Sequence, residues 1–214
     1  MQNKQPQHVM DEIERVTLEH YESNSESFWL GTRDHDVSQN VHALLQALPK
    51  GKTLDLLDFG CGPGRDLLTF KSLGHRPTGL DGNKTFCEMA GKHSGCPVLH
   101  QQFLNLDLGT DCFDGIFANA SMFHVPSQEL PRVLVACHQA LREGGVLFTS
   151  NPRGNAEGWQ GQRYGNYMEF EENKACLEHA GFVLMHHYYR PEGKPRDQQP
   201  WLAMVAQKNT VKIT

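Results

Sequence analysis

The chain has 214 residues, of which 38% are hydrophobic and 21% charged, a composition typical of one folded domain and not of a disordered chain. Its formal net charge of −5 argues against a nucleic-acid partner, which is bound through clustered Lys and Arg. No apolar stretch approaches the roughly 20 residues that cross a bilayer, and the polar N-terminus lacks the apolar core of a signal peptide. We therefore expect a single cytoplasmic domain (residues 1–214) without a membrane or nucleic-acid partner.

Two amphipathic helices are predicted over residues 9–21 and 37–48, within an N-terminal helical cap of residues 1–50. Beyond the cap, strands alternate with helices, which is the pattern of a doubly wound α/β sheet in a core of residues 51–208. The predicted strands cover residues 53–59, 76–80, 98–102, 113–119, 146–150, 182–189 and 201–207, and the predicted core helices cover residues 66–73, 84–93, 127–141 and 169–180.

The last third of the chain departs from this alternation. Residues 151–168 are rich in Gly, Arg, Asn and aromatic residues, show no clear period, and are predicted to form a substrate loop. This loop leaves the carboxyl end of a strand, where open α/β sheets bind their ligands. The two final strands follow each other without a helix, so they predict an antiparallel edge on an otherwise parallel sheet.

Cysteine and histidine occur without the spacings of a disulfide framework or a metal site. The six cysteines form no C-x-x-C pair, and the chain is large enough to fold without cross-links. The twelve histidines include no H-E-x-x-H pattern. We therefore expect reduced, mostly buried cysteines and no bound metal.

A glycine-rich turn joins the first predicted strand of the core to the helix that follows. Gly60, Gly62 and Gly64 allow positive φ and let the backbone approach a ligand closely. A dinucleotide fingerprint, G-x-G-x-x-G, would need its third glycine at Arg65, and Pro63 lacks an N–H that a pyrophosphate would use. The turn therefore favours a nucleoside without phosphates over NAD. Taken alone, it is also typical of a tight strand-to-helix connection.

Two acidic residues accompany the turn. Asp81 ends the second predicted strand of the core, where an ionised carboxylate can accept hydrogen bonds from both hydroxyls of a ribose. Asp58 directly precedes the glycines, where it can hold the turn or meet the ammonium group of a ligand. The order of strand, glycine turn, helix, strand and acid predicts a nucleoside site.

These features resemble the class I S-adenosylmethionine-dependent methyltransferases, especially the UbiG-like small-molecule methylases. Residues 58–64 match the family's acidic residue-x-Gly-x-Gly-x-Gly motif, and Asp81 matches its second-strand acid. Residues 113–125 resemble its fourth-strand motif, and residues 141–147 its Leu-x-Pro-Gly-Gly-x-Leu turn. The resemblance implies a Rossmann-like, doubly wound, seven-stranded α/β sheet, mostly parallel with an antiparallel last strand, and S-adenosyl-L-methionine as the cofactor.

The resemblance also implies which residues bind this cofactor. The family carries an acid after its third strand that meets the adenine amino group, and Gln102 stands in that place here. Its amide oxygen can accept the same hydrogen bond. The predicted cofactor-binding residues are Asp58, Gly60, Cys61, Gly62, Asp81, Gly82, Gln102, Phe103, Leu104, Asn119 and Ala120.

The substrate site is predicted in the segments that decorate the core, because the protein's main task in methyl transfer is to align donor and acceptor. We predict that residues 27–40 fold over the mouth of the sheet as a helical lid, with Trp29 and Trp159 excluding water. Arginines there can clamp a carboxylate bidentately. The predicted substrate-binding residues are Arg33, Trp29, Arg153, Trp159, Arg163 and Tyr164. For each of them, a role on the solvated surface or in helix packing is the alternative.

Two histidines are the candidate catalytic bases, although a base is needed only if the acceptor arrives protonated. His124 follows the fourth strand of the core, near the expected place of the sulfonium. His35 stands between Asp34 and Asp36, which can orient it. The alternatives are packing or cofactor contact for His124, and an exposed histidine at a helix start for His35.

The sequence thus predicts an enzyme that methylates an O, N or S atom of a small polar metabolite, as a single chain or a homodimer. Two alternatives stay open. A cofactor-binding or protein-modifying partner without small-molecule turnover would share the fold. An NAD-dependent oxidoreductase is disfavoured by Gly64 and Arg65.

Overall fold

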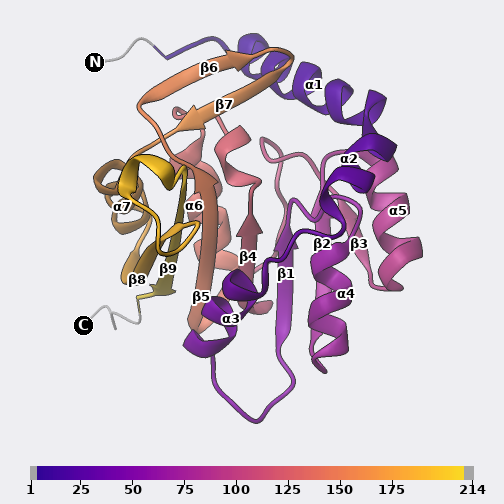
Figure 1. Cartoon of the computed structure of the whole chain (residues 1–214), viewed down its shortest axis with the longest axis vertical. Coiled ribbons are helices and arrows are strands. Elements are labelled where there is room, and N and C mark those ends of the chain that lie inside the picture. The colour runs from indigo at the N-terminus through magenta and orange to yellow at the C-terminus, as the bar shows by residue number, and fades with distance from the viewer. Residues whose placement is uncertain (1–3, 210–214) are drawn as a thin grey trace.

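A computed structural model describes residues 4–209 and contains a seven-stranded sheet in the order β3-β2-β1-β4-β5-β9-β8 (Figure 1). Every neighbouring pair is parallel except the two that involve β9. The predicted Rossmann-like sheet with an antiparallel last strand is therefore confirmed. The strands of this sheet and of a separate hairpin, β6–β7, are β1 (Asp55–Phe59), β2 (Arg76–Asp81), β3 (Val98–His100), β4 (Phe113–Asn119), β5 (Leu141–Pro152), β6 (Ala156–Gln160), β7 (Arg163–Tyr167), β8 (Phe182–Arg190) and β9 (Trp201–Lys208).

The two final strands form the antiparallel edge that the sequence predicts, with β9 as the inner strand of the pair and β8 as the outermost strand of the sheet. Ala203 of β9 pairs with Ser150 on one side and with Tyr188 on the other, so β9 lies inside the sheet. Its residues 202–206 are all buried, as in an internal strand covered on both faces. The edge is β8, whose Val183 and Met185 are about half exposed.

Helices cover both faces of the sheet, with α3, α4 and α5 on one face and α6 and α7 on the other (Figure 1). Successive strand residues point to opposite faces, so Leu57 packs with α6 while Leu56 packs with α3. Within residues 4–209, no helix is long and apolar enough to cross a membrane. The helices of the core are α3 (Ser38–Ala47), α4 (Arg65–Ser72), α5 (Lys84–Ser94), α6 (Leu130–Ala140) and α7 (Phe170–His179), with short 3-10 turns η1 (Met122–His124) and η2 (Arg196–Gln198).

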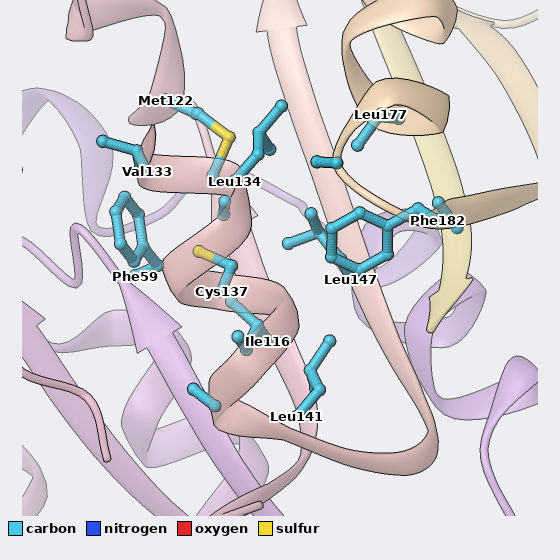
Figure 2. Packing of buried hydrophobic residues seen from close by; sticks show 14 of the residues in the cluster. Phe59, Ile116, Met122, Val133, Leu134, Cys137, Leu141, Leu147, Leu177 and Phe182 are labelled. Carbon is cyan, nitrogen blue, oxygen red and sulfur yellow. The ribbon is translucent and has the colours of Figure 1, made fainter. Parts of the chain in front are cut away.

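The packing of α6 shows how the apolar pattern builds the core (Figure 2). Val133, Leu134 and Cys137 recur at the spacing that places side chains on one face of a helix, and all three are buried. They pack with Ile116 of β4 and Leu147 of β5 (Figure 2). Burial raises the pKa of the Cys137 thiol to about 12, so this cysteine acts as a small apolar residue. All six cysteines are free, as predicted, but only Cys61 and Cys137 are buried, so the expectation that most of them are buried is wrong.

A cap lies over the carboxyl ends of the parallel strands (Figure 1). It consists of α1 (Gln7–Ser23), α2 (Ser25–Thr32) and the hairpin β6–β7. The hairpin replaces most of the loop predicted over residues 151–168, and its two-residue turn carries Gly161 at φ +63°. The sequence hides this hairpin because the side chains of β6 are largely exposed and show no apolar alternation.

Candidate functional site

The glycine turn after β1 presents backbone instead of side chains to a cavity. Gly60 and Gly64 adopt φ values of +76° and +91°. A Cβ at Gly60 would collide with Ser121, and one at Gly64 would lie 2.7 Å from the Ala90 Cα. Gly62, at φ +50°, faces space, since a Cβ there would meet nothing nearer than 3.6 Å. Backbone conformation requires all three glycines, and close packing requires two of them.

The acid at the end of β2 meets this turn directly. Asp81 accepts a hydrogen bond from the Gly62 N–H at 2.9 Å through Oδ2 and one from the Asn83 N–H at 2.8 Å through Oδ1. The side chain is buried, and burial raises the pKa of Asp81 to about 6 although both N–H donors oppose this shift. A carboxylate has several lone pairs, so Asp81 can accept further hydrogen bonds from a ligand.

Two cavities meet at the glycine turn. The inner cavity, about 90 Å³, lies between the turn and α1, and the outer cavity, about 610 Å³, opens on the other side of the turn. The larger volume is within the range of small-molecule sites, roughly 300–1,000 Å³. The residues that line both cavities are Tyr21, Phe28, Gly60, Gly62 and Ala120.

Two carboxylates lie close together behind the turn. Asp58 in β1 is 2% exposed, and its Oδ2 has no hydrogen-bond partner within residues 4–209. Burial and then the neighbouring Asp66 raise the pKa of Asp58 well above its usual range. Asp66 lines the outer cavity and accepts hydrogen bonds from Arg65 at 2.7 and 2.8 Å. A buried acceptor without a partner, next to a second carboxylate, suits a cationic group of a ligand.

The end of β4 brings two further residues to the cavities. Asn119 accepts a hydrogen bond from Asn40 at 2.8 Å and donates one to Asp66 at 3.3 Å. Ala120 adopts φ +61°, with its N–H bonded to the Ser150 carbonyl at 2.7 Å. The left-handed conformation costs a non-glycine residue about 1–2 kcal/mol. Such strain is held in place by the surrounding structure and is typical of functional sites.

His124 lies in the inner cavity with both ring nitrogens occupied. Its Nδ1 lies 2.6 Å from the Tyr164 carbonyl, which can only accept, so Nδ1 carries the proton. Nε2 then accepts from the Tyr21 hydroxyl at 2.9 Å. Burial lowers the pKa of His124 to about 4, which keeps the imidazole neutral. The Tyr21 hydroxyl also contacts Arg163, whose charge opposes the rise that burial causes in the pKa of Tyr21.

Arginines give the outer cavity a positive surplus. Arg65 is balanced by its two-point pair with Asp66. Arg163 and Arg190 also line the cavity and form no ion pair with a carboxylate in the described part of the chain. Arg190 donates to the Asp36 carbonyl at 3.2 Å. Asp36 lines the same cavity and interacts electrostatically with Arg190, so the three arginines and two aspartates of the lining leave a net charge of +1 for an anionic ligand.

The structure brings most of the predicted site residues to these two cavities. Asp58 lies just behind the lining. Within residues 4–209, no group of three or more His, Cys, Asp or Glu could hold a metal ion. The predicted residues that line a cavity are Gly60, Cys61, Gly62, Asp81, Gly82, Phe103, Leu104, Asn119, Ala120, Trp29, His35, His124 and Arg163.

Two of the predicted substrate arginines are engaged elsewhere. Arg153 pairs with Glu169 at 2.9 Å and donates to two backbone carbonyls of the link between β8 and β9, at 2.7 and 2.5 Å. Its donors hold this link in place, so the structure gives Arg153 a structural role. Arg33 is exposed and pairs with Asp34 at 3.2 Å. Neither arginine lines a cavity.

Three other predicted residues also lie outside the cavities. Trp159 is 46% exposed on the hairpin, and its ring packs edge-on against Tyr164 at 5.5 Å. Trp159 therefore does not form a lid with Trp29, whose ring packs instead against His93 at 4.9 Å. Tyr164 reaches the site only through its carbonyl, which holds His124 in place. The third residue is Gln102, whose side chain is exposed.

One face of α1 supplies residues that stand outside the predicted cofactor- and substrate-binding sets. Glu14, Thr17, Leu18 and Tyr21 all line the inner cavity, at the spacing i, i+3, i+4, i+7 that puts side chains on one helix face. This spacing is visible in the sequence, but the stripe mixes an acid, a hydroxyl and an aromatic residue. A search for apolar periodicity passes over such a stripe.

Comparison with protein families places a known domain over this site. Residues 56–145 match a family model described as a methyltransferase domain. The match runs from β1 into β5, so it includes the glycine turn, Asp81 and the end of β4. It leaves out α1, α2 and the hairpin, which close the cavities.

Two curated relatives resemble part of the chain. Trans-aconitate 2-methyltransferase of Paracidovorax citrulli is 29% identical over 127 residues, which cover 55% of this chain and 46% of the relative. Malonyl-[acyl-carrier protein] O-methyltransferase of Pectobacterium atrosepticum is 30% identical over 105 residues, which cover 49% of this chain and 41% of the relative. The chain thus spans somewhat less than half the length of these relatives.

A solved structure extends the similarity over nearly the whole chain. The 1,6-didemethyltoxoflavin-N1-methyltransferase of Burkholderia thailandensis, with bound 1,6-didemethyltoxoflavin and S-adenosylhomocysteine, superposes with a TM-score of 0.76. The superposition covers 98% of this chain and 93% of that chain, at 22% identity. At this identity, the similarity shows that the two chains share a fold, including the cap.

Proposed function

Because the chain belongs to the class I S-adenosylmethionine-dependent methyltransferase family, we propose that it transfers a methyl group from this cofactor to a small polar metabolite that carries a carboxylate. The observation that carries the proposal is the hydrogen bond of 2.9 Å between the Gly62 N–H and Asp81. It joins the glycine turn and the sugar-binding acid at one point, where the inner and outer cavities meet.

The groups around this point fit the cofactor. Asp81 has lone pairs for the sugar hydroxyls, and the apolar wall that contains Phe86 and Phe103 suits a flat base. Asp58, behind the turn, has a buried oxygen without a partner among residues 4–209, which can accept a hydrogen bond from the ammonium of the amino-acid part. The cofactor supplies an electrophilic methyl group on its sulfonium. The chain's task is to hold donor and acceptor in line, which can contribute about 7–11 kcal/mol to catalysis.

The outer cavity supports a carboxylate-bearing substrate. Arg163 and Arg190 line it without a carboxylate partner among residues 4–209, and the guanidinium fork matches a carboxylate in shape and charge. Trp29 and Trp201 add apolar surface on the same lining. Trans-aconitate and the malonyl group, named for two relatives, both carry carboxylates. Charge and size of the cavity therefore favour a small organic acid.

The contact between Tyr21 and His124 determines whether His124 can act as a base toward the atom that accepts the methyl group. A pKa of about 4 makes His124 a weak base, and its Nε2 is already bonded to the Tyr21 hydroxyl. An acceptor such as a carboxylate oxygen arrives ionised and needs no base. We therefore assign His124 to holding Tyr21 at the junction of the cavities. His35, at the outer cavity, is the candidate base for an acceptor that arrives protonated.

Two experiments test the two halves of the proposal. In calorimetry, the purified chain is expected to bind S-adenosylhomocysteine and not NADH; the opposite result would overturn the cofactor assignment. With methyl-labelled cofactor and a panel of mono-, di- and tricarboxylic acids, amines and thiols, the label is expected in a carboxylic acid. Label that appears only in compounds without a carboxylate would overturn the substrate class.

A further inference from the structure

The inner cavity contains a second carboxylate that the proposed function does not use. Glu14 of α1 lines the cavity, and its Oε1 accepts a hydrogen bond from the Leu104 N–H at 3.0 Å. The Phe103 N–H lies near the same carboxylate. Burial raises the pKa of Glu14, and these N–H donors offset only part of this rise. A partly buried acid of this kind needs further partners to be stable in its charged form.

No cation supplies that partner in the described part of the chain. Glu14 forms no ion pair there, and Arg132, whose charge acts on Glu14 from a distance, pairs with Glu129 at 2.9 Å and donates to the Leu104 carbonyl. The neighbouring acids of α1 behave differently, since Glu12 pairs with Arg15 on the exposed side of the helix. Glu14 is thus the acid of this helix that lines the cavity, and its carboxylate keeps lone pairs available to a ligand.

The other polar side chains of the inner cavity already have partners. Asp81 holds the turn, the Ser121 hydroxyl donates to the Phe59 carbonyl at 2.5 Å, and the Thr17 hydroxyl accepts from the Tyr164 N–H at 3.1 Å. Tyr21 and His124 bond to each other. Gln102, predicted to read the base, is exposed and outside the lining. Asp81 is assigned to the sugar hydroxyls, so Glu14 is the remaining carboxylate of this lining that a base can meet.

The walls near Glu14 are flat and apolar. Phe103 stacks on Phe59 with ring centroids 4.4 Å apart, and Phe28 and Phe86 pack at 5.2 Å across the cavity lining. Such walls suit a purine but cannot distinguish one purine from another. An ionised carboxylate is acceptor-only, so it attracts an exocyclic amino group and repels an exocyclic carbonyl in the same place.

We propose that Glu14 is the residue that selects the base of the cofactor, by accepting a hydrogen bond from the 6-amino group of adenine. This inference rests on the proposed function, because it takes the inner cavity to hold the nucleoside. It assigns base recognition to the N-terminal helix, outside the residues that match the methyltransferase family model. Cofactor binding and closure of α1 over the cavity are then coupled through one side chain.

Calorimetric titration with two nucleosides tests the assignment. S-adenosylhomocysteine carries the 6-amino group, and S-inosylhomocysteine carries an oxo group instead. The unmodified chain is expected to prefer the adenosine compound. Glu14→Gln is expected to lower its affinity about tenfold, the size of one hydrogen bond to a charged group. The same variant is expected to bind the inosine compound better than the unmodified chain does, because an amide can donate to the oxo group.

The ratio of the two affinities separates recognition from folding. A variant that merely loosens α1 would lower the affinities for both compounds equally and leave their ratio unchanged. An unchanged ratio in Glu14→Gln would therefore overturn the proposal. Glu12→Gln on the same helix and Gln102→Ala are controls expected to keep both the affinities and the ratio. If the unmodified chain binds neither compound, the proposed function fails; if it binds both and Glu14→Gln changes nothing, only the role of Glu14 fails.

Discussion

The inner and outer cavities share one glycine turn but are enclosed by different kinds of structure. The inner cavity is small and is lined by one face of α1, by Phe28 of α2 and by the segments that directly follow β1, β2, β3 and β4. The outer cavity is nearly seven times larger by the volumes above, and segments far apart in the chain surround it. These segments are α2, the hairpin and the ends of β8 and β9, which bring in Trp29, Arg163, Arg190 and Trp201.

On the proposed function, the difference follows from the ligand that each cavity would bind. A nucleoside can be cradled by backbone atoms and one acid, so the inner cavity needs glycines and Asp81 at fixed spacing. A substrate carboxylate needs cations that lie close together, and these come from two elements far apart in the chain, the hairpin and the end of β8. We expect substitutions in the two cavities to have separable effects, on cofactor affinity in one and on substrate KM in the other.

Asp81→Asn is expected to have the largest effect. An amide has a single acceptor oxygen, so it cannot serve the N–H groups of Gly62 and Asn83 and the sugar hydroxyls together. Hydrogen bonds to a charged group contribute about 1.5–3 kcal/mol each, so affinity for S-adenosylhomocysteine should fall about 100-fold. Calorimetry measures this loss. At saturating cofactor, the substrate KM of this variant should stay within about threefold of the value for the unmodified chain if the effects of the two cavities are separable.

The matched control for this variant is Asp34→Asn, which removes an exposed carboxylate of the cap paired only with Arg33. Its cofactor affinity should equal that of the unmodified chain, because exposed ion pairs contribute little. A loss below tenfold in Asp81→Asn would contradict the assignment of Asp81 to the sugar.

Arg163→Met is expected to show the next largest effect, now in the outer cavity. Methionine keeps much of the length of the side chain but removes the charge that would bind a substrate carboxylate. The substrate KM should rise about 30-fold, equivalent to about 2 kcal/mol, with cofactor affinity nearly unchanged. Steady-state kinetics and calorimetry on the same preparation measure both.

Arg153→Met sharpens this comparison, because Arg153 was predicted for the same role. It is held by Glu169 and by backbone carbonyls away from both cavities. Removing it should lower the melting temperature and leave the substrate KM unchanged. A KM effect as large as that of Arg163→Met would mean that the substrate extends to the link between β8 and β9.

The sequence predicts the inner cavity better than the outer one. Residues 58–64 and Asp81 carry the backbone requirements of the turn in their identity and spacing, so motif and geometry agree. Arg163 and Arg153 look alike in sequence, and only the pairing of β6 with β7 and the position of Glu169 separate them. Such long-range contacts leave no local pattern. The face of α1 with Glu14 and Tyr21 lies between these cases, since its spacing was visible and its mixed chemistry hid it.

The pH dependence of cofactor binding gives a smaller effect that also belongs to the inner cavity. Burial raises the pKa of Asp81 to about 6, and sugar hydroxyls favour its ionised form. Affinity should therefore be full above about pH 7 and fall about tenfold between pH 7 and pH 5, as the carboxylate takes up a proton before binding. Asp58, Cys87 and His100 also lie near Asp81, so the test compares the profile with that of Asp81→Asn. The variant should lose the part of this dependence that comes from Asp81, and Asp81→Asn combined with Glu14→Gln separates it from any part that comes from Glu14, whose pKa burial also raises.

Trp159→Ala has the smallest expected effect and is the sharpest test of the boundary of the outer cavity. The sequence predicts that Trp159 is a lid residue, whereas the structure places Trp159 on the hairpin, 46% exposed and packed on Tyr164. Both kcat and KM should change less than twofold, because removing a half-exposed ring leaves Arg163 and the hairpin register in place. Trp29→Ala is the matched comparison. Trp29 lines the outer cavity, so its removal should raise the substrate KM. Equal effects of the two variants would mean that the hairpin closes over the substrate in the working enzyme, and the outer cavity would then extend beyond its present walls.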